Sequence, residues 1–390
     1  MRRVRGTAAA CLLAVLVLAG CGRSLEPAGS SQNNLTAAGA PAAGGAQSVP
    51  HPGPLRADVV TAELMLWRSD TIPARVLKKI RAVPGVGANV QFSLAQVRSQ
   101  DRPITFAAVD PGAFRRFAVK QTARTQPLWN RIADGEVALR STLRDSVPLA
   151  GDVVPLGGSL TAHVGYYTDE LVVGSGIDAV VNSAWAGRLG MPPGNAVLLS
   201  VAADDTEAAV RKLKKLAGRD GAVEPLSASG STSGRAVPAG GFAAAVGSFS
   251  YTINPDGSVN PDPRWISQYI RTERVPILGN VTCSKAMLPQ LRAALAEIAA
   301  SDLADEINPG EYGGCYVPRF IGSDPTRGLS LHTWGLAVDL NVPGNLRGTA
   351  GTMDPRIVQI FNRWGFAWGG TWRDPDPMHF ELAQLMRVGR

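Results

Sequence analysis

The sequence is poor in histidine and cysteine, two residue types that commonly bind zinc. It has four of each in 390 residues. The cysteines show no C-x-x-C spacing of the kind that zinc sites use. A zinc site in this chain therefore has to be built from histidines and carboxylates.

The sequence also lacks runs of lysine and arginine with interleaved aromatic residues, although its formal net charge is +7 and its pI is near 9.5. Because such runs are typical of nucleic-acid-binding proteins, no nucleic acid partner is expected. Anionic lipid or an anionic wall polymer fits the positive charge better. The length allows two domains plus tails, and an apolar content of 45% is enough for large cores.

Residues 1–20 are predicted to be an export signal. Three arginines among the first five residues precede an apolar run over residues 8–18 that is too short for a stable membrane span. The run ends in Leu-Ala-Gly-Cys at residues 18–21, which resembles the bacterial lipobox. This resemblance implies that Cys21 is lipidated and becomes the first residue of the mature protein. A plain secretory signal with a chance cysteine at its cleavage site is the alternative.

Residues 21–57 are predicted to be a flexible tether on the extracytoplasmic face of the cell membrane. Between about residues 22 and 54 the chain is mostly alanine, glycine, serine, proline and asparagine, so burial cannot offset the entropy lost on ordering. His51, in this stretch, is expected to be solvated.

Cys283 and Cys315 are the cysteines that remain once Cys11 is removed with the signal and Cys21 is acylated. Outside the cytoplasm, two remaining thiols favour a disulfide over a reactive pair. Such a bond would tie the start of a predicted helix at 285–300 to the loop that leads to Arg319.

Residues 58–226 are predicted to be an α+β domain with two β-α-β units that bracket an insertion at about 100–190. Each unit has a strand, an amphipathic helix and a second strand: residues 59–67, 73–83 and 86–97 in the first, and 195–201, 206–217 and 223–226 in the second. This pattern favours a ferredoxin-like split arrangement.

The order of elements over residues 58–226 resembles the extracytoplasmic core domain of MacB/FtsX-type permeases, in which a βαβ layer carries a mostly β subdomain. The resemblance implies a protein-contact module without chemistry, with a membrane protein as its candidate partner. An unrelated α+β spacer is the alternative.

Residues 227–247 are rich in serine, glycine and alanine and are predicted to be a linker to a second domain at 248–390. Besides the helix at 285–300, this domain is expected to contain a helix that has Asp354 as its N-cap and ends at Gly365.

Two motifs near the end of the chain combine histidines with carboxylates. They are Ser-x-His-x-x-Gly-x-Ala-x-Asp at 330–339 and Asp-x-x-His-x-Glu at 376–381, and together they hold two of the four histidines. His51 and His163 have no carboxylate, thiol or imidazole at comparable spacing. Two imidazoles and one carboxylate suit zinc, and three protein ligands leave a fourth position for water.

These two motifs, with Trp-Gly-Gly-x-Trp at 368–372 and Gly-Cys-Tyr-x-Pro-Arg at 314–319, resemble the VanY-like branch of the D-alanyl-D-alanine carboxypeptidase and L-alanyl-D-glutamate endopeptidase metalloenzymes. The resemblance spans about residues 248–385. It implies the α+β fold that these peptidases share with Hedgehog-type domains, and one zinc ion. The fold alone would not establish activity.

At matching positions, the resemblance implies that His332, Asp339 and His379 bind zinc and that Asp376 is the catalytic acid/base. A carboxylate three residues before a ligand can reach a water at the metal without binding the metal itself. Asp374 is a competing candidate for this role, and the choice between the two stays open here.

Three further residues are candidates for the site. The resemblance implies that Arg319 holds the substrate carbonyl or a carboxylate, and a surface arginine is the alternative. Ser330 is expected to bond to substrate, to orient His332 or merely to cap a turn. Glu381 is predicted to accept the second ring N–H of a ligand histidine and so to fix its tautomer.

These features predict a membrane-anchored, extracytoplasmic zinc peptidase that hydrolyses peptidoglycan stem peptides as a D,D-carboxypeptidase or an L,D-endopeptidase. The alternative is a non-catalytic lipoprotein that uses a peptidase-like fold to bind wall peptide or a partner. Metal-dependent release of D-alanine or of cleaved stem peptide would separate the two.

Overall fold

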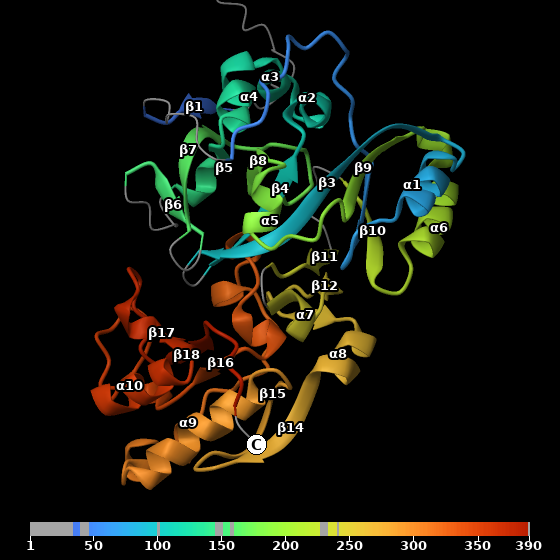
Figure 1. Cartoon of the computed structure of the whole chain (residues 1–390). Helices are drawn as coiled ribbons and strands as arrows, with labels where there is room; N and C mark the ends of the chain where they lie inside the picture. The colour runs from blue at the N-terminus through green and yellow to red at the C-terminus, as the bar shows by residue number, and fades with distance from the viewer. Residues whose placement is uncertain are drawn as a thin grey trace, which may run out of the picture. The chain divides into compact units, whose positions relative to one another are not determined.

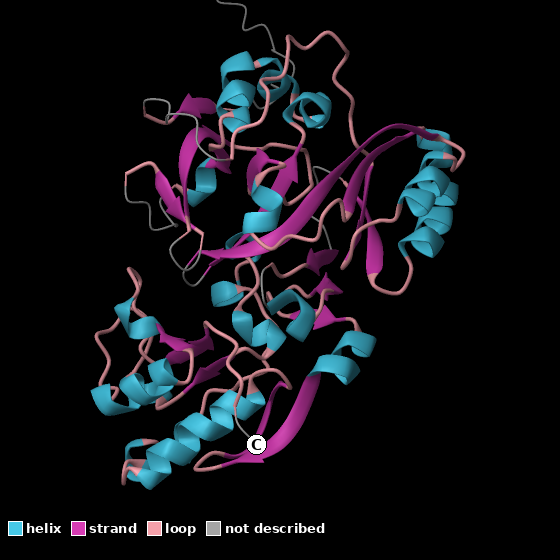
Figure 2. Ribbon diagram, viewed as in Figure 1, coloured by secondary structure: helices cyan, strands magenta, loops and turns pink. Residues whose placement is uncertain are grey.

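The structure, a computed structural model, describes residues 34–39, 47–99, 102–144, 151–156, 160–226, 233–239 and 242–388. It is a mixed α and β protein with several sheets (Figures 1 and 2). The predicted signal peptide and Cys21 lie outside the described residues. Among the described helices, none combines the length and apolar character that a membrane span needs.

The first part of the chain forms one large sheet, in which nine strands follow the order β1-β7-β5-β8-β4-β3-β9-β2-β10 and β6 pairs with β7. The strands are β1 (Leu35–Ala37), β2 (Leu64–Arg68), β3 (Val86–Ser99), β4 (Arg102–Val109), β5 (Val137–Arg140), β6 (Val153–Pro155), β7 (Thr161–Thr168), β8 (Ala179–Asn182), β9 (Ala196–Val201) and β10 (Gly221–Pro225). The helices are α1 (Ala74–Arg81), α2 (Pro111–Phe114), α3 (Lys120–Arg124), α4 (Gln126–Ala133), α5 (Trp185–Arg188) and α6 (Thr206–Ala217).

The two predicted β-α-β units are present as β2-α1-β3 and β9-α6-β10, with strand order β3-β9-β2-β10. Helices α1 and α6 lie side by side on one face of these strands (Figure 1). Because side chains alternate along a strand, Leu64 and Leu66 of β2 pack in the core beneath these helices, whereas Met65 and Trp67 pack in the core on the other face. The sheet is thus buried on both faces.

The insertion is joined to these units through β3, which is long enough to pair with both β9 and β4. The insertion alternates strands with the short helices α2 to α5 and so contains more helix than the mostly β subdomain that the resemblance implied. Helix α2 begins where Asp110 accepts a hydrogen bond from the backbone of Ala113 at 2.8 Å, and Pro111 occupies its first turn.

The described parts of the predicted tether contact this first domain. Strand β1 pairs with β7, and Ala38 is only 5% exposed. Further along, the backbone N–H of Val49 donates to the carbonyl of Ala133 at 2.8 Å. The expectation of a wholly flexible tether is therefore wrong for these residues, because an edge strand offers unpaired backbone groups that even a small-residue segment can satisfy.

The predicted linker 227–247 contains two elements, β11 (Ser233–Ala236) and α7 (Ala243–Val246). Strand β11 pairs with β12, and the last residue of α7 is fully buried in the same core. The carbonyl of Val237 also accepts a hydrogen bond from the backbone of Gln96 in β3 at 2.5 Å. The core of the second domain therefore begins before the predicted boundary at 248.

The C-terminal part has its own buried core and three small sheets, ordered β11-β12-β13, β14-β15 and β16-β18-β17. The remaining strands are β12 (Phe249–Ile253), β13 (Val259–Pro261), β14 (Ile270–Val275), β15 (Gly279–Ser284), β16 (Ala337–Asp339), β17 (Phe366–Trp368) and β18 (His379–Leu382). The helices are α8 (Pro263–Tyr269), α9 (Leu288–Ala300) and α10 (Pro355–Arg363).

Helices α9 and α10 correspond to the two predicted helices and pack against each other. Helix α9 begins three residues later than predicted because β15 extends to Ser284. The side chain of Asp354 accepts a hydrogen bond from the backbone of Arg356 at 2.7 Å and so caps α10 as predicted. These helices and the sheet β16-β18-β17 contribute to a single core beneath the two motifs.

Candidate functional site

The two motifs meet through the pairing of two short strands. In the antiparallel pair β16 and β18, Asp339 lies directly opposite His379, and Ala337 lies opposite Glu381. His332 comes from the short 3-10 helix η9 (Leu331–Trp334) that precedes β16. Strand register therefore brings together two residues that are forty positions apart in the sequence.

Glycine is required where η9 ends. Gly335 has a φ of 63°, and a Cβ atom there would lie 2.6 Å from the backbone nitrogen of Ser284. Its carbonyl accepts a hydrogen bond from that nitrogen at 2.9 Å. The glycine of the first motif thus lets the chain turn from His332 into β16 while touching the neighbouring hairpin.

The side chains of His332, Asp339 and His379 converge on one point. The Nε2 atom of His332 lies 3.2 Å from Oδ1 of Asp339 and 3.2 Å from Nδ1 of His379, and the last two atoms are 3.0 Å apart. A tetrahedral zinc ion with bonds of about 2.0–2.1 Å would hold its ligand atoms about 3.3 Å apart. The donor set and its spacing therefore fit zinc.

Each histidine uses its second ring nitrogen to contact a fixed acceptor. The Nδ1 atom of His332 lies 3.0 Å from the carbonyl oxygen of Cys315, and Nε2 of His379 lies 3.2 Å from a carboxylate oxygen of Glu381. When these nitrogens carry the protons, the opposite nitrogens are left to bind metal. The geometry is the one predicted for Glu381, and sequence reasoning missed the acceptor provided by Cys315.

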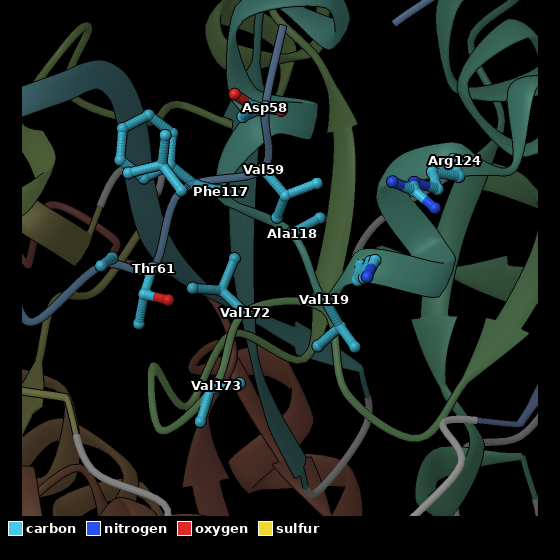
Figure 3. Close-up of a pocket in the computed structure, with 12 residues that line it drawn as sticks. Asp58, Val59, Thr61, Phe117, Ala118, Val119, Arg124, Val172 and Val173 are labelled. Carbon is cyan, nitrogen blue, oxygen red and sulfur yellow. The ribbon is translucent and has the colours of Figure 1, made fainter. Parts of the chain in front are cut away.

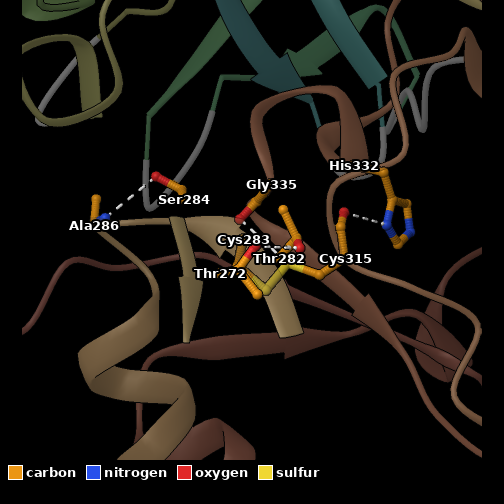
Figure 4. The surroundings of a disulfide bond; sticks show 8 residues. All are labelled: Thr272, Thr282, Cys283, Ser284, Ala286, Cys315, His332 and Gly335. Atoms are coloured by element: carbon orange, nitrogen blue, oxygen red, sulfur yellow. Dashed lines mark hydrogen bonds between the residues drawn. A yellow bond between two sulfur atoms is a disulfide. The ribbon is translucent and has the colours of Figure 1, made fainter. Parts of the chain in front are cut away.

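The expected disulfide between Cys283 and Cys315 is present, with the two Cα atoms 5.4 Å apart. Figure 4 shows that the carbonyl oxygen bonded to His332 belongs to the bridged Cys315 itself. The bond thus ties β15 to the group that orients a ligand histidine. The disulfide was predicted to support the loop that leads to Arg319. It instead supports the orientation of a candidate metal ligand directly.

Burial and charge shift the pKa values of these groups. Burial alone would raise the pKa of Asp339, but His332 and His379 hold it well below its usual range. Burial alone would lower the pKa of His379, but hydrogen bonds to Asp339 and Glu381 raise it to about 10. A metal ion bound through Nδ1 of His379 would therefore have to displace a proton from that ring.

A cavity of about 190 Å³ lies beside the three ligand residues. Its lining includes Arg319, Ser330 and Asp376. The Arg319 guanidinium lies 3.9 Å from the Asp339 carboxylate, and its side chain is 31% exposed, so it can reach a bound ligand. The Ser330 hydroxyl accepts a hydrogen bond from the backbone of His332 at 3.4 Å, which matches the turn-cap role.

The structure distinguishes the two candidate bases. Asp376 lines the cavity and is buried, and its Oδ1 atom has no hydrogen-bonding partner among the described residues. The side chain of Asp374 is 58% exposed, lies outside the cavity lining and pairs with Arg347 at 2.7 Å. Burial raises the pKa of Asp376, the direction that a general base near neutral pH requires. The geometry thus favours Asp376.

The Trp-Gly-Gly segment supports the loop that carries Asp376. The indole N–H of Trp368 donates to the carbonyl of Pro377 at 2.8 Å, and the backbone of Asp376 donates to the carbonyl of Gly369 at 2.9 Å. A Cβ atom on Gly369 would lie 2.5 Å from the carbonyl oxygen of Asp376. This motif therefore shapes the site without contributing chemistry. Trp372, the last residue of the motif, lines the cavity and packs on the ring of His379.

Arg347 also lines the cavity, and sequence reasoning missed it. It lies in a loop after β16 that carries none of the four motifs, so its sequence context offered no signal.

The remaining histidines lie outside this site. Nε2 of His51 lies 2.7 Å from a carboxylate oxygen of Asp134, so His51 has a partner that sequence reasoning did not expect. His163 lies 3.6 Å from Glu136. Within the described ranges, His332, Asp339 and His379 form the group whose ligand atoms lie close enough to share one metal ion.

A second cavity of about 450 Å³ lies in the first domain (Figure 3). Its lining is largely apolar, as Phe117, Val119 and Val172 illustrate. It also includes the charged residues Lys120 and Arg124. It contains no histidine or cysteine.

The solved structures that resemble the chain include two transporter domains. The extracellular domain of the noncanonic ABC-type transporter YknZ from Gram-positive bacteria is 14% identical, with 41% of this chain and 98% of that chain covered and a TM-score of 0.26. The periplasmic region of MacB from Actinobacillus actinomycetemcomitans is 8% identical, with 42% and 88% covered and a TM-score of 0.25. At these TM-scores the similarity supports no conclusion about residues 58–226.

No curated protein matches the chain. Residues 323–382 match the family model described as D-alanyl-D-alanine carboxypeptidase. The matched segment contains all three candidate zinc ligands and Asp376, in the order that the motifs predicted. Over residues 323–382, the C-terminal part of this chain is therefore similar to D-alanyl-D-alanine carboxypeptidases.

Proposed function

We propose that the C-terminal domain is a zinc-dependent peptidase that hydrolyses peptidoglycan stem peptides outside the cytoplasm, as a D,D-carboxypeptidase or an L,D-endopeptidase. The observation that carries this proposal is the convergence of three buried ligand atoms within 3.2 Å of one another, beside a cavity lined by a buried carboxylate with an unpartnered oxygen. The family of the matched segment supplies the substrate class.

In this proposal, Nε2 of His332, Oδ1 of Asp339 and Nδ1 of His379 hold the metal. A zinc ion held by these atoms would supply Lewis-acid chemistry, which lowers the pKa of a nearby water and polarises a carbonyl oxygen. Oδ1 of Asp376 accepts the proton of the attacking water and later delivers it to the departing amine. The permanently charged guanidinium of Arg319 stabilises the negative charge that develops on the carbonyl oxygen, or holds a substrate carboxylate.

The size of the cavity limits what it can hold. At about 190 Å³ it is smaller than the roughly 300–1,000 Å³ of pockets that enclose whole drug-sized ligands. It therefore accommodates the small residues next to the cut bond, and the rest of a stem peptide lies outside it.

The N-terminal predictions complete the proposal. Lipidation of Cys21 would anchor the chain to the membrane at its extracytoplasmic face, and residues 58–226 would contact a membrane protein. Metabolic labelling with a fatty-acid analogue, compared between wild type and Cys21→Ala, tests the anchor. Label that persists in the variant would contradict it.

The peptidase proposal is tested with the purified chain and a panel of stem peptides, with products identified by mass spectrometry and zinc measured in the same samples. Wild type is expected to release D-alanine or a cleaved stem peptide. Asp376→Asn should lose turnover and keep zinc, whereas His332→Ala should lose both. Zinc-bound wild type that cleaves no member of the panel would contradict the proposal and favour a non-catalytic lipoprotein that binds wall peptide.

A further inference from the structure

The buried carboxylate of Asp376 forms a hydrogen bond with a single side chain of the described residues. Among the described residues, its only hydrogen-bonding partner is Arg347, whose NH1 atom lies 3.4 Å from Oδ2 of Asp376. The Oδ1 atom of the same carboxylate has no such partner. Oδ2 of Asp376 is thus held by a hydrogen bond, whereas Oδ1 can accept a proton.

Arg347 is itself held by a second carboxylate. Its Nε and NH2 atoms donate to Oδ2 of Asp374 at 2.9 and 2.7 Å. The planar guanidinium therefore bridges two aspartates that flank Pro375. Because the fork has a fixed geometry, fixing two of its nitrogens also fixes the direction of the third.

The backbone places Arg347 beside this loop. The N–H of Gly348 donates to the carbonyl of Pro375 at 2.7 Å, and the N–H of Met378 donates to the carbonyl of Asn345 at 3.1 Å. The segment after β16 thus runs along the loop that carries Asp376. These backbone hydrogen bonds hold the Cα of Arg347 close to the loop, within reach of both aspartates.

We propose that Arg347 is a positioning residue: with Asp374 as its support, it anchors one oxygen of Asp376 so that the other is presented to the cavity beside His332, Asp339 and His379. This inference rests on the proposed function, since it acts through the proposed base. It also gives a role to Asp374, whose side chain is 58% exposed and does not line the cavity.

A competing role for Arg347 is direct binding of a substrate carboxylate, because its side chain lines the cavity and is 27% exposed. The two roles differ in kinetics. A residue that binds substrate equally in the ground and transition states affects KM, whereas one that orients the base affects kcat.

The test is steady-state hydrolysis of a stem peptide by the zinc-loaded full chain. Arg347→Ala should lower kcat on the order of a hundredfold, because misplacing a reacting group by about 1 Å has a cost of that size. KM should change less than about threefold, and Arg347→Lys should retain part of the activity. Arg356→Ala is the matched control, since it also removes an arginine that pairs with an aspartate, but its side chain is 60% exposed and does not line the cavity. It should leave kcat unchanged.

Two further variants probe the bridge itself. Asp374→Asn should lower kcat less than Arg347→Ala does, and the double variant should be no worse than Arg347→Ala, because Asp374 acts only through Arg347. Guanidinium ion added to Arg347→Ala should restore part of kcat. A rise in KM of tenfold or more with unchanged kcat, or effects of the two variants that multiply, would overturn the positioning role.

A crystal structure of Arg347→Ala gives a readout that does not depend on activity. The Asp376 carboxylate is expected to leave the position it has in the wild type, while His332, Asp339 and His379 keep theirs. An unmoved carboxylate would overturn the inference. Wild type without any hydrolysis would refute the proposed function instead, so the two failures are distinguishable.

Discussion

Removing the disulfide between Cys283 and Cys315 should destabilise the C-terminal domain and leave the first domain unaffected. The bond closes a loop with a sequence separation of 32 residues that contains helix α9. For a closed loop of that size, the chain-entropy estimate gives about 3.7 kcal/mol of stabilisation. Against a typical domain stability of about 5–15 kcal/mol, this loss would leave the C-terminal domain marginal.

The variant for this test is Cys283→Ala/Cys315→Ala, because both cysteines are buried and alanine adds no buried hydroxyl that would need a partner. Hydrogen exchange read by mass spectrometry gives a separate free energy of opening for each segment. Amides of α9 should lose about 3–4 kcal/mol of protection. Amides of α6, which belongs to a different core, serve as the internal control.

The same variant should bind zinc more weakly, because the carbonyl of Cys315 orients the ring of His332. Loss of a hydrogen bond that orients a metal ligand typically lowers metal affinity about tenfold to a hundredfold. The variant loosens this carbonyl without removing it, so the expected decrease lies toward the lower end of that range. Unchanged protection of α9, to within about 1 kcal/mol, would refute the loop-constraint reasoning. Unchanged zinc affinity would refute the coupling between the disulfide and the site.

Three further predictions concern the site. Glu381→Gln should lower zinc affinity about tenfold to a hundredfold, since it removes the charged acceptor of the His379 ring; equal affinities in equilibrium dialysis would contradict this. Because the pKa of His379 is raised to about 10, both ring nitrogens of the metal-free residue carry protons below that pH, and zinc would have to displace one of these protons. Zinc affinity should therefore fall as pH decreases from 9 to 7 in a chelator competition, by about tenfold per unit for one displaced proton, and a flat profile would contradict the shift. Gly369→Ala should lower turnover while zinc content stays at the wild-type value, because the added Cβ would lie 2.5 Å from the carbonyl oxygen of Asp376 and push that loop aside. Wild-type turnover in this variant would show that the loop tolerates the shift.

Local signals in the sequence predicted several elements well. Helix α6 has the predicted bounds, Thr206–Ala217, because its apolar periodicity is regular and Gly218 ends it. Helix α10 was predicted from its N-cap Asp354 and the proline that follows. Caps and periodicity act within one or two turns, so they can be found without knowledge of the fold.

The hairpin β14-β15 was missed, and its sequence explains why. Strand β14, Ile-Arg-Thr-Glu-Arg-Val, buries only its first and last residues, so it shows no alternation of apolar and polar positions. Its turn places Ile277 at a φ of 63°, where glycine or asparagine would have been a signal. Tertiary contacts override the local preference here.

The sequence by itself determined which residues can bind zinc, because few histidines exist and two of them fall in recognisable motifs. It also determined that Cys283 and Cys315 should pair. Only the tertiary structure distinguished Asp376 from Asp374 as candidate bases, since burial of one and exposure of the other depend on how the loop packs against the segment after β16. It alone revealed Arg347, because a contact between side chains 29 positions apart has no local signature and forms only when strand pairing has set the register.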